Sequence, residues 1–173
     1  GPDRAFVLEN LIAEADAAAT DRERVRRIGS VFDGAPFPVS SLLGNHDAVN
    51  LNRSTFADLP GQGSSGLVDV GDGPVPFLDS SWTALEGARG HLGDDQRAWL
   101  REVPAGLSDA VGLVHHPVGP FDLSASPWFA DYPERALLGD RKGLFGALAA
   151  HGGLLAAVSG HLHTHGRALF WGR

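Results

Sequence analysis

The stretch Pro38-Val-Ser-Ser-Leu-Leu-Gly44-Asn45-His46-Asp47 joins a short apolar segment to a polar tetrapeptide. Residues 38–43 predict a buried strand, so the tetrapeptide would lie in the loop that follows it. Asparagine offers a neutral oxygen ligand, histidine a proton donor, and aspartate a partner that can orient the histidine ring and raise its pKa. Such a His–Asp pair beside a bound phosphate suits general acid catalysis. A turn or a helix cap would explain the same four residues equally well.

Two further histidine clusters also follow predicted apolar strands. The sequence His115-His116-Pro117 comes directly after residues 111–114, and Gly160-His161-Leu-His163 follows residues 154–158. Loops after strand ends are where ligands gather in layered α/β domains. Alternate residues of an extended segment point the same way, so His161 and His163 can reach one centre. Taken singly, His115-His116-Pro117 is equally compatible with a structural role, and two surface loop histidines are the alternative for His161 and His163.

The remaining pattern alternates strands with helices and predicts a layered α/β domain. Thr20-Asp-Arg-Glu23 has the spacing of a capping box and predicts the start of a helix that ends at Asp33-Gly34. Asp94 or Asp95 is expected to cap a helix after Gly93. The mixed apolar pattern of residues 3–19 fits a helix or a strand that turns into one. Further strands are predicted at 67–70, 75–78 and 168–171, further helices at 54–59 and 144–151, and a loop over the site at 117–139.

Composition places the chain among ordinary globular proteins. Its 173 residues suffice for a single domain (1–173), with 43% hydrophobic and 20% charged residues. The formal net charge of −7 disfavours nucleic acid as a partner, because phosphate backbones favour a basic face. No apolar run reaches the roughly 18 residues of a membrane helix, so we expect no membrane partner and a cytoplasmic location. Cysteine and methionine are absent, so any metal must be held by His, Asp, Glu or Asn, and we expect a processed or truncated chain.

In their order along the chain, the three histidine motifs resemble those of the calcineurin-like metallophosphoesterase family. The resemblance covers residues 39–166 and includes the intervening segments Phe77-Leu-Asp-Ser80 and Gly90-His-Leu-Gly-Asp-Asp-Gln-Arg-Ala-Trp-Leu100. It implies an α/β fold in which a layered β-sandwich is flanked by helices. It also implies metal-dependent hydrolysis of a phosphate mono- or diester, with a small phosphorylated compound as substrate. The expected cofactors are two divalent ions of Mn, Fe or Zn in a dinuclear centre.

Matched residue by residue, the family pattern assigns roles to these motifs. Asn45, His115 and His161 would bind one metal ion, and His163 would bind the other. His46 would be the general acid, with Asp47 fixing its ring. Supporting or substrate-facing roles are expected for three further aromatic side chains, namely His116, His165 and Trp128.

The chain departs from the family pattern near its beginning. It contains no Asp-x-His tripeptide, and Glu9-Asn10 stands where the family's Gly-Asp-x-x-Asp segment begins. Asn10 would therefore occupy the position of the carboxylate that bridges the two ions, and a neutral amide replaces that charge poorly. We expect an N-terminally incomplete fold, with one metal ion as the alternative to two and self-association through a sheet edge. The competing hypotheses are a catalytically impaired fragment with a partial metal site and a binding module that uses the pocket beneath residues 117–139.

Overall fold

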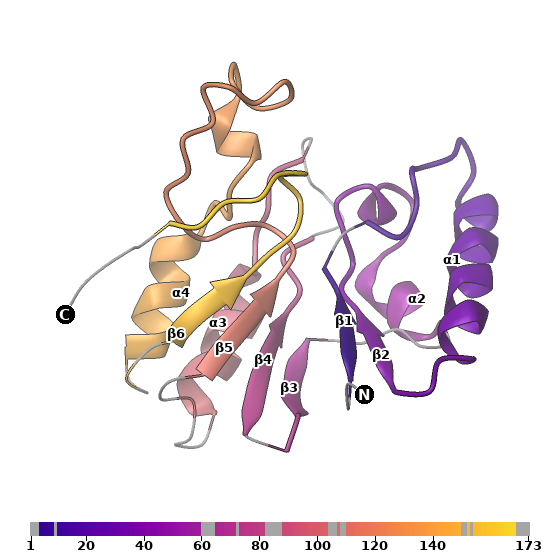
Figure 1. Cartoon of the computed structure of the whole chain (residues 1–173), viewed down its shortest axis with the longest axis horizontal. Coiled ribbons are helices and arrows are strands. Elements are labelled where there is room, and N and C mark those ends of the chain that lie inside the picture. The colour runs from indigo at the N-terminus through magenta and orange to yellow at the C-terminus, as the bar shows by residue number, and fades with distance from the viewer. Residues whose placement is uncertain are drawn as a thin grey trace.

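The computed structural model describes residues 4–8, 10–59, 65–71, 73–81, 88–103, 107, 110–149, 152 and 154–168. Within them the chain forms a mixed α/β fold with two β-sheets and four α-helices (Figure 1), which confirms the expected α/β class. The strands are β1 (Ala5–Val7), β2 (Val39–Ser41), β3 (Gly66–Asp69), β4 (Pro74–Leu78), β5 (Ala110–Val114) and β6 (Leu154–Val158). The helices are α1 (Ala18–Phe32), α2 (Arg53–Ala57), α3 (Gly93–Glu102) and α4 (Arg141–Leu148), with 3₁₀ turns at η1 (Asp47–Val49) and η2 (Pro133–Arg135).

The larger sheet has the strand order β3-β4-β5-β6, and its connections explain that order. β3 and β4 are antiparallel and are joined by a tight turn in which Gly71 and Gly73 have φ of 87° and 136°, values that favour glycine. β4, β5 and β6 are parallel, and their crossovers carry α3 and α4, because parallel pairing needs a long connection. The strands predicted at 75–78 and 111–114 lie within β4 and β5, and the strand predicted at 154–158 is β6, so these predictions are confirmed.

The smaller sheet settles the ambiguous beginning of the chain. β1 pairs in parallel with β2, with Ala5 opposite Val39 and Val7 opposite Ser41. The crossover between them contains α1, which begins only at Ala18. The mixed pattern of residues 3–19 therefore contains a strand and a loop before the helix. The strand predicted at 168–171 lies outside the described residues except for Ala168, as does Glu9.

Three apolar clusters hold the layers together. Leu100 and Leu144 of α3 and α4 pack with Leu78 and Val114 of the larger sheet. Val25 of α1 and Phe56 of α2 belong to a second cluster that includes Leu43, two residues after β2. A third cluster joins the two sheets and includes Leu42, Phe77 and Leu113, with the rings of Phe6 and Phe77 5.7 Å apart. The helices thus cover the outer sides, and the two sheets share an apolar contact.

The start of α1 corrects the predicted capping box. α1 begins at Ala18, two residues before Thr20, and its N-cap residue makes no side-chain hydrogen bond. Asp21 instead turns inward, is fully buried and accepts the backbone N–H of Ala15 at 3.1 and 3.2 Å. The amide of Asn50 donates to the same carboxylate at 2.8 Å. The predicted capping box is therefore wrong. Thr20 lies inside the helix, and the acidic residue that binds a backbone N–H near the start of α1 is the buried Asp21.

A residue distant in sequence also caps α3. The carboxylate of Asp140 accepts the backbone N–H groups of Leu92 and Gly93 at 3.0 and 3.1 Å. Asp94 and Asp95, the predicted caps, lie in the first turn instead. The predicted short helix at 54–59 is α2, which begins at Arg53 and is capped by Asn52 through a 2.9 Å bond to the backbone N–H of Thr55.

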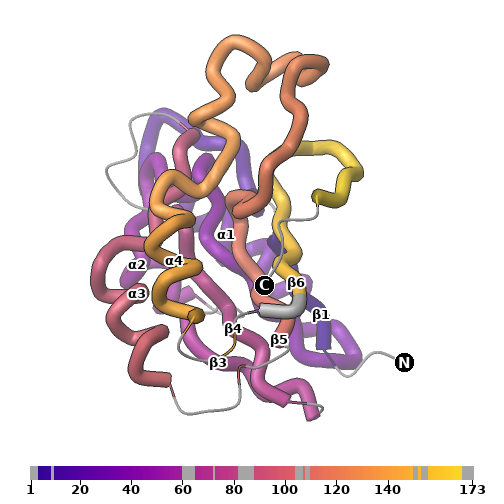
Figure 2. Tube along the Cα trace, turned by 90° about the vertical axis from the view of Figure 1, so that its left-hand side faces the viewer, coloured from indigo at the N-terminus to yellow at the C-terminus, as the bar shows by residue number. Residues whose placement is uncertain are grey.

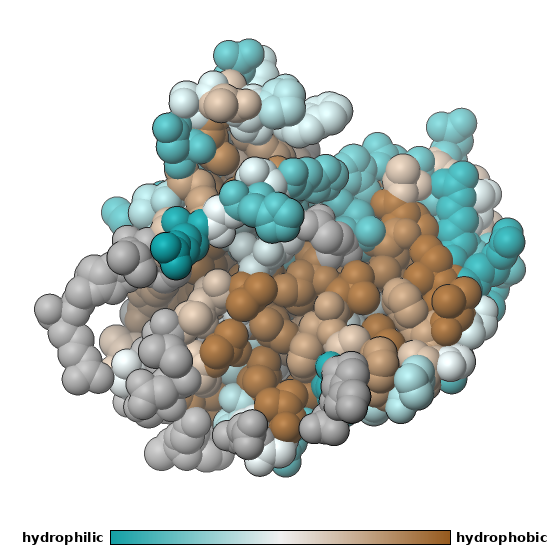
Figure 3. Space-filling view, in the orientation of Figure 1, coloured by the Kyte–Doolittle hydropathy of each residue, from teal (hydrophilic) through white to brown (hydrophobic). Residues whose placement is uncertain are grey.

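Segment 117–139 rises beyond the carboxyl ends of β5 and β6 (Figures 1 and 2). It contains only the single turn η2 and packs an apolar cluster of its own around Leu123, Phe129 and Ala136. Below it, Figure 3 shows apolar side chains gathered over the strands on the face in view. Two residues of the larger sheet, Leu67 in β3 and Val158 in β6, are 40% and 47% exposed. No helix among the described residues is both long and apolar enough to cross a bilayer.

Candidate metal centre

His115 follows β5 and is fully buried. Its Nδ1 lies 2.6 Å from the carbonyl oxygen of Leu8, which can only accept, so Nδ1 carries the proton. The lone pair is then on Nε2, which lies 3.1 Å from Oδ1 of Asn45, a second acceptor. Burial, followed by the charge of His161, lowers the pKa of His115 to about 3, so the ring is neutral. The predicted ligands Asn45 and His115 are therefore adjacent, with two acceptor atoms facing each other.

His161 reaches the same place from the loop after β6. Its ring centroid lies 5.0 Å from that of His115 and 4.4 Å from that of His116. Nε2 donates to the carbonyl oxygen of Arg135 at 3.2 Å, so the neutral ring has its lone pair on Nδ1. Burial lowers the pKa of His161 to about 4. A second neutral imidazole with an acceptor nitrogen thus stands beside the first.

The backbone of the third motif is held in a left-handed conformation. His161 and His163 have φ of 71° and 52°, and they are the two non-glycine residues with positive φ in the described part of the chain. Such conformations cost about 1–3 kcal/mol each and persist where the surroundings impose them, as at binding sites. The side chain of His163 is exposed, and its charge contributes to lowering the pKa of both His115 and His161. His163 therefore lies close to the buried pair.

His116 completes a buried group of three histidines whose ligand atoms lie within 4.8 Å of one another. Its Nε2 donates to the carbonyl oxygen of Ala88 at 2.8 Å, and its Nδ1 accepts from the hydroxyl of Ser80 at 2.8 Å. Ser80 also accepts the backbone N–H of His116 at 3.1 Å. Both ring nitrogens are thus engaged, and burial lowers the pKa of His116 well below its usual range. A metal could use Nδ1 of His116 only by displacing Ser80, so His116 supports the site more readily than it binds an ion.

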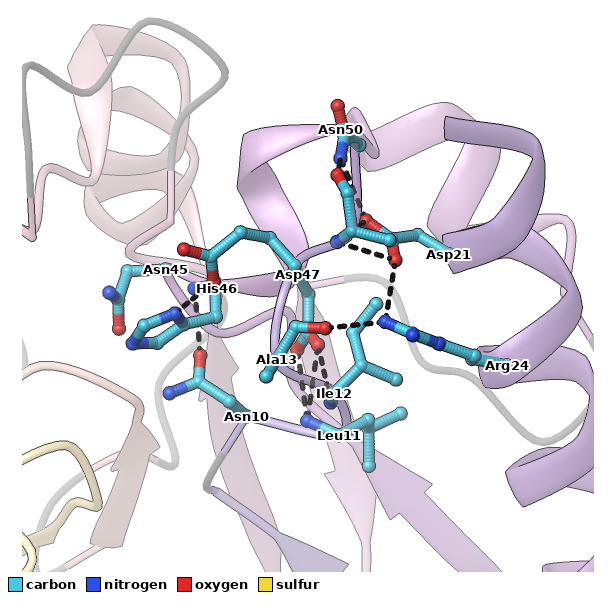
Figure 4. A network of polar contacts seen from close by, with 12 residues as sticks. Asn10, Leu11, Ile12, Ala13, Asp21, Arg24, Asn45, His46, Asp47 and Asn50 are labelled. Atoms are coloured by element: carbon cyan, nitrogen blue, oxygen red, sulfur yellow. Dashed lines mark hydrogen bonds and ion pairs between the residues drawn. The ribbon is translucent and has the colours of Figure 1, made fainter. Parts of the chain in front are cut away.

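Asn10 lies beside the Gly44-Asn45-His46 loop, near the place expected for a bridging residue (Figure 4). Its Oδ1 accepts the backbone N–H of His46 at 2.9 Å. A Cβ at Gly44 would come within 2.1 Å of the same oxygen, so this close approach requires glycine. The structure therefore brings the degenerate position Asn10 to the predicted site.

Asp47 has a different partner from the one expected. Its buried carboxylate accepts the backbone N–H groups of Leu11, Ile12 and Gly44 at 2.9 to 3.2 Å (Figure 4). Burial raises its pKa to about 6, against the lowering effect of these hydrogen bonds. The carboxylate that contacts Nδ1 of the His46 ring is Glu14. The predicted role of Asp47, to fix the His46 ring, is therefore wrong. Its carboxylate is occupied by backbone N–H groups, and a residue of the loop after β1 contacts the ring instead.

No family model matches this chain, and no curated protein matches it. The resemblance to calcineurin-like metallophosphoesterases thus rests on the sequence motifs alone. Asn45, His115 and His161 come from three separate loops, after β2, β5 and β6, and meet at one point. The structure therefore brings together the three side chains that the resemblance assigned to one metal ion, and the binding of an ion stays a prediction.

Other expected residues lie farther out, and some contacts were not foreseen. His165 is exposed, and Trp128 is 70% exposed on segment 117–139. Phe129, next to Trp128, packs its ring 5.0 Å from that of His161. Neither the Phe129 contact nor the Glu14 contact could be found from the motifs, because both residues come from loops without any periodic pattern.

Proposed function

We propose that this chain is a metal-dependent phosphoester hydrolase domain of the calcineurin-like type. The observation that carries the proposal is the buried pair formed by His115 Nε2 and Asn45 Oδ1, 3.1 Å apart, with neutral His161 beside it. Two facing acceptors repel each other unless a cation lies near both of them or the amide rotates to present its NH₂ group. Nitrogen and neutral oxygen donors of this kind suit Mn²⁺, Fe or Zn²⁺.

The arrangement of the layers agrees with this proposal. Helices α1 and α2 pack on the side of the smaller sheet, α3 and α4 on the larger one, and an apolar cluster joins the sheets. An order of helices, two sheets and helices is compatible with the flanked β-sandwich that the family resemblance implies, and the layering of the family stays part of the proposal. The strained backbone at His161 and His163 also supports a binding role, since strain of this kind persists where structure serves a site.

The residues present fit one metal ion better than two. Asn45, His115 and His161 would hold the first ion, and His163 is the residue left for a second. Asn10, which stands at the bridging position, is neutral. In the described residues, the one group of three close metal-binding side chains is built from histidines alone. When bound, a divalent ion would supply Lewis acidity toward a phosphate oxygen and make water more acidic.

His46 supplies the chain's own proton chemistry in this proposal. Its ring is half exposed, and the residue directly follows Asn45, whose Oδ1 lies 3.1 Å from Nε2 of His115. A protonated imidazole there can give its proton to the leaving oxygen of a phosphoester, a contribution worth about 10²–10⁴-fold in rate. The substrate would be a small phosphate mono- or diester, because the net charge of −7 opposes binding of long polyanions.

The second candidate is a catalytically impaired chain that keeps this partial metal site. Asn10 specifically favours it, because without a bridging carboxylate a dinuclear centre lacks the charge that holds two cations close together. The two candidates differ in turnover and share the prediction that metal binds at His115 and His161.

Chelator-treated chain should be titrated with Mn²⁺ and Zn²⁺ by calorimetry, and hydrolysis of bis(p-nitrophenyl) phosphate and p-nitrophenyl phosphate measured in parallel. We expect binding that is lost in His115→Ala and His161→Ala and kept in His91→Ala, which replaces a histidine that contacts Asp140 outside the group. Turnover that His46→Ala abolishes supports the hydrolase, whereas metal binding without turnover supports the impaired chain. Failure of wild type to bind either metal would overturn both.

A further inference from the structure

The ring of His46 is held by a carboxylate that its own motif does not contain. Nδ1 of His46 contacts Oε2 of Glu14, and the two side chains are 46% and 43% exposed. Exposed ion pairs usually contribute little to stability, because two long side chains must be ordered to form them. The contact therefore matters for what it does to the ring rather than for the fold.

The backbone around Glu14 is fixed on both sides, which limits the positions that its side chain can take. On one side the carboxylate of Asp47 holds the N–H groups of Leu11 and Ile12. On the other side the buried carboxylate of Asp21 holds the N–H of Ala15 at 3.1 Å. Two buried aspartates thus present Glu14 to the loop that carries His46, whose own N–H is bound to Asn10.

The contact also determines which ring nitrogen faces away. A carboxylate can only accept, so the nitrogen that contacts Glu14 is Nδ1–H. Nε2, on the opposite side of the ring, is then left to exchange a proton with another group. Asp47 lies next in sequence, but its carboxylate is occupied by three backbone N–H groups.

We propose that Glu14 is the positioning residue of His46, fixing the Nδ1–H form of the ring so that Nε2 delivers the proton to the leaving oxygen. This inference rests on the proposed hydrolase function. In that reaction a water oxygen forms the new P–O bond while the P–O bond to the alcohol breaks. The alcohol oxygen takes the Nε2 proton of His46, and the proton released by the water passes to solvent, from which His46 is reprotonated. Glu14 keeps its charge throughout and stabilises the imidazolium before transfer.

The tautomer of His46 tests the contact without any need for turnover. Long-range ¹⁵N–¹H spectra of the metal-free chain at alkaline pH report which ring nitrogen bears the proton. We expect Nδ1–H for His46 in wild type and in Glu14→Gln, whose amide oxygen still accepts. We expect Nε2–H to become populated in Glu14→Ala. Asp16→Asn, which removes an exposed acidic group from the same loop, should leave the spectrum unchanged. An unchanged tautomer in Glu14→Ala, or Nε2–H in wild type, would overturn the inference.

Leaving-group dependence tests the consequence for catalysis. Glu14→Ala should lower kcat about tenfold for a diester with an alkyl leaving group and much less for a p-nitrophenyl ester, whose anion needs little protonation. A structural defect would lower both rates equally, and that result would count against the positioning role. Absence of turnover in wild type with any metal overturns the proposed function. In that case a tautomer change in Glu14→Ala still supports Glu14 as the residue that orients the ring.

Discussion

The carboxylate of Asp47 accepts the backbone N–H of Leu11, with 3.1 and 3.2 Å to its two oxygens. The same carboxylate accepts the N–H groups of Ile12 and Gly44 at 3.0 and 2.9 Å. These bonds join the loop after β1 to the loop after β2, and the two loops carry Asn10, Glu14, Asn45 and His46. Asp47 therefore acts as a buried clasp that places both halves of the candidate site.

Removal of this clasp should be costly. Asp47→Ala leaves three backbone N–H groups without their acceptor, each worth about 1–3 kcal/mol when buried, so we expect a loss of about 2–5 kcal/mol in the free energy of unfolding. Glu14→Ala removes a carboxylate from an exposed pair and should change stability by less than about 1 kcal/mol. Urea unfolding of both variants gives the comparison. Equal losses would show that the clasp contributes no more than a surface contact.

The close approach of Gly44 to Asn10 gives a second prediction. A methyl group at position 44 would lie 2.1 Å from Oδ1 of Asn10 and 2.9 Å from its Cα, so the backbone itself must shift. We expect Gly44→Ala to cost about 1–3 kcal/mol and to weaken metal binding, because Asn45 moves with the loop. Gly66→Ala is the matched control, since a Cβ there meets nothing within 4 Å. A Gly44→Ala chain as stable as the control would contradict the packing described here.

Sequence patterns predicted the parts of this molecule that depend on local chemistry. The strand β6 and the turn between β3 and β4 followed from apolar runs and glycine positions, and His115 and His161, from two of the motifs, lie side by side. The cap of α3 was missed because it is a residue distant in sequence, Asp140, which directly precedes α4. The partner of the His46 ring was missed for the same reason. Glu14 lies in a loop without a periodic pattern, so nothing in the sequence indicates that its carboxylate contacts the His46 ring.

Restoring charge at position 10 should change the number of metal ions bound. Asn10→Asp keeps the oxygen that accepts the His46 N–H and adds the negative charge that a bridging ligand supplies. We expect about one ion per chain in wild type and a second in Asn10→Asp, measured by elemental analysis after gel filtration. Asn52→Asp adds the same charge at an exposed helix cap and should bind no extra ion. Two ions in wild type would mean that another group already supplies the missing charge.

The exposed apolar face predicts concentration-dependent self-association. β6 is an edge strand of the larger sheet among the described residues, and Val158 at its end is 47% exposed. Apolar sheet faces and edges of this kind favour pairing with a second chain. Sedimentation velocity over a wide concentration range should show a growing dimer fraction, which Val158→Lys reduces and Val49→Lys, at an exposed apolar residue in η1, does not. A strictly monomeric wild type would contradict this expectation.

The buried histidines determine how stability depends on pH in the metal-free chain. Burial lowers the pKa of His115 to about 3 and that of His161 to about 4, both from 6.5, and that of His116 falls as well. Between pH 6.5 and 4 the unfolded chain therefore binds protons that the folded chain does not, and stability falls as pH falls. Asp47 acts in the opposite direction, because its folded pKa of about 6 lies above the unfolded value of 3.8.

Burial also raises the pKa of Asp79, which acts in the same direction as Asp47. Three histidines outweigh these two aspartates, so we expect a net loss on the order of 1–2 kcal/mol for each pH unit of acidification around the middle of that window. Asp47→Asn removes one of the opposing groups, so its loss of stability per pH unit should be steeper, by about 1 kcal/mol, whatever its stability at neutral pH. Urea midpoints and slopes across the window measure both chains. Stability that rises on acidification, or an equal slope in Asp47→Asn, would show that the histidines are not held neutral in the folded chain or that Asp47 is not held protonated there.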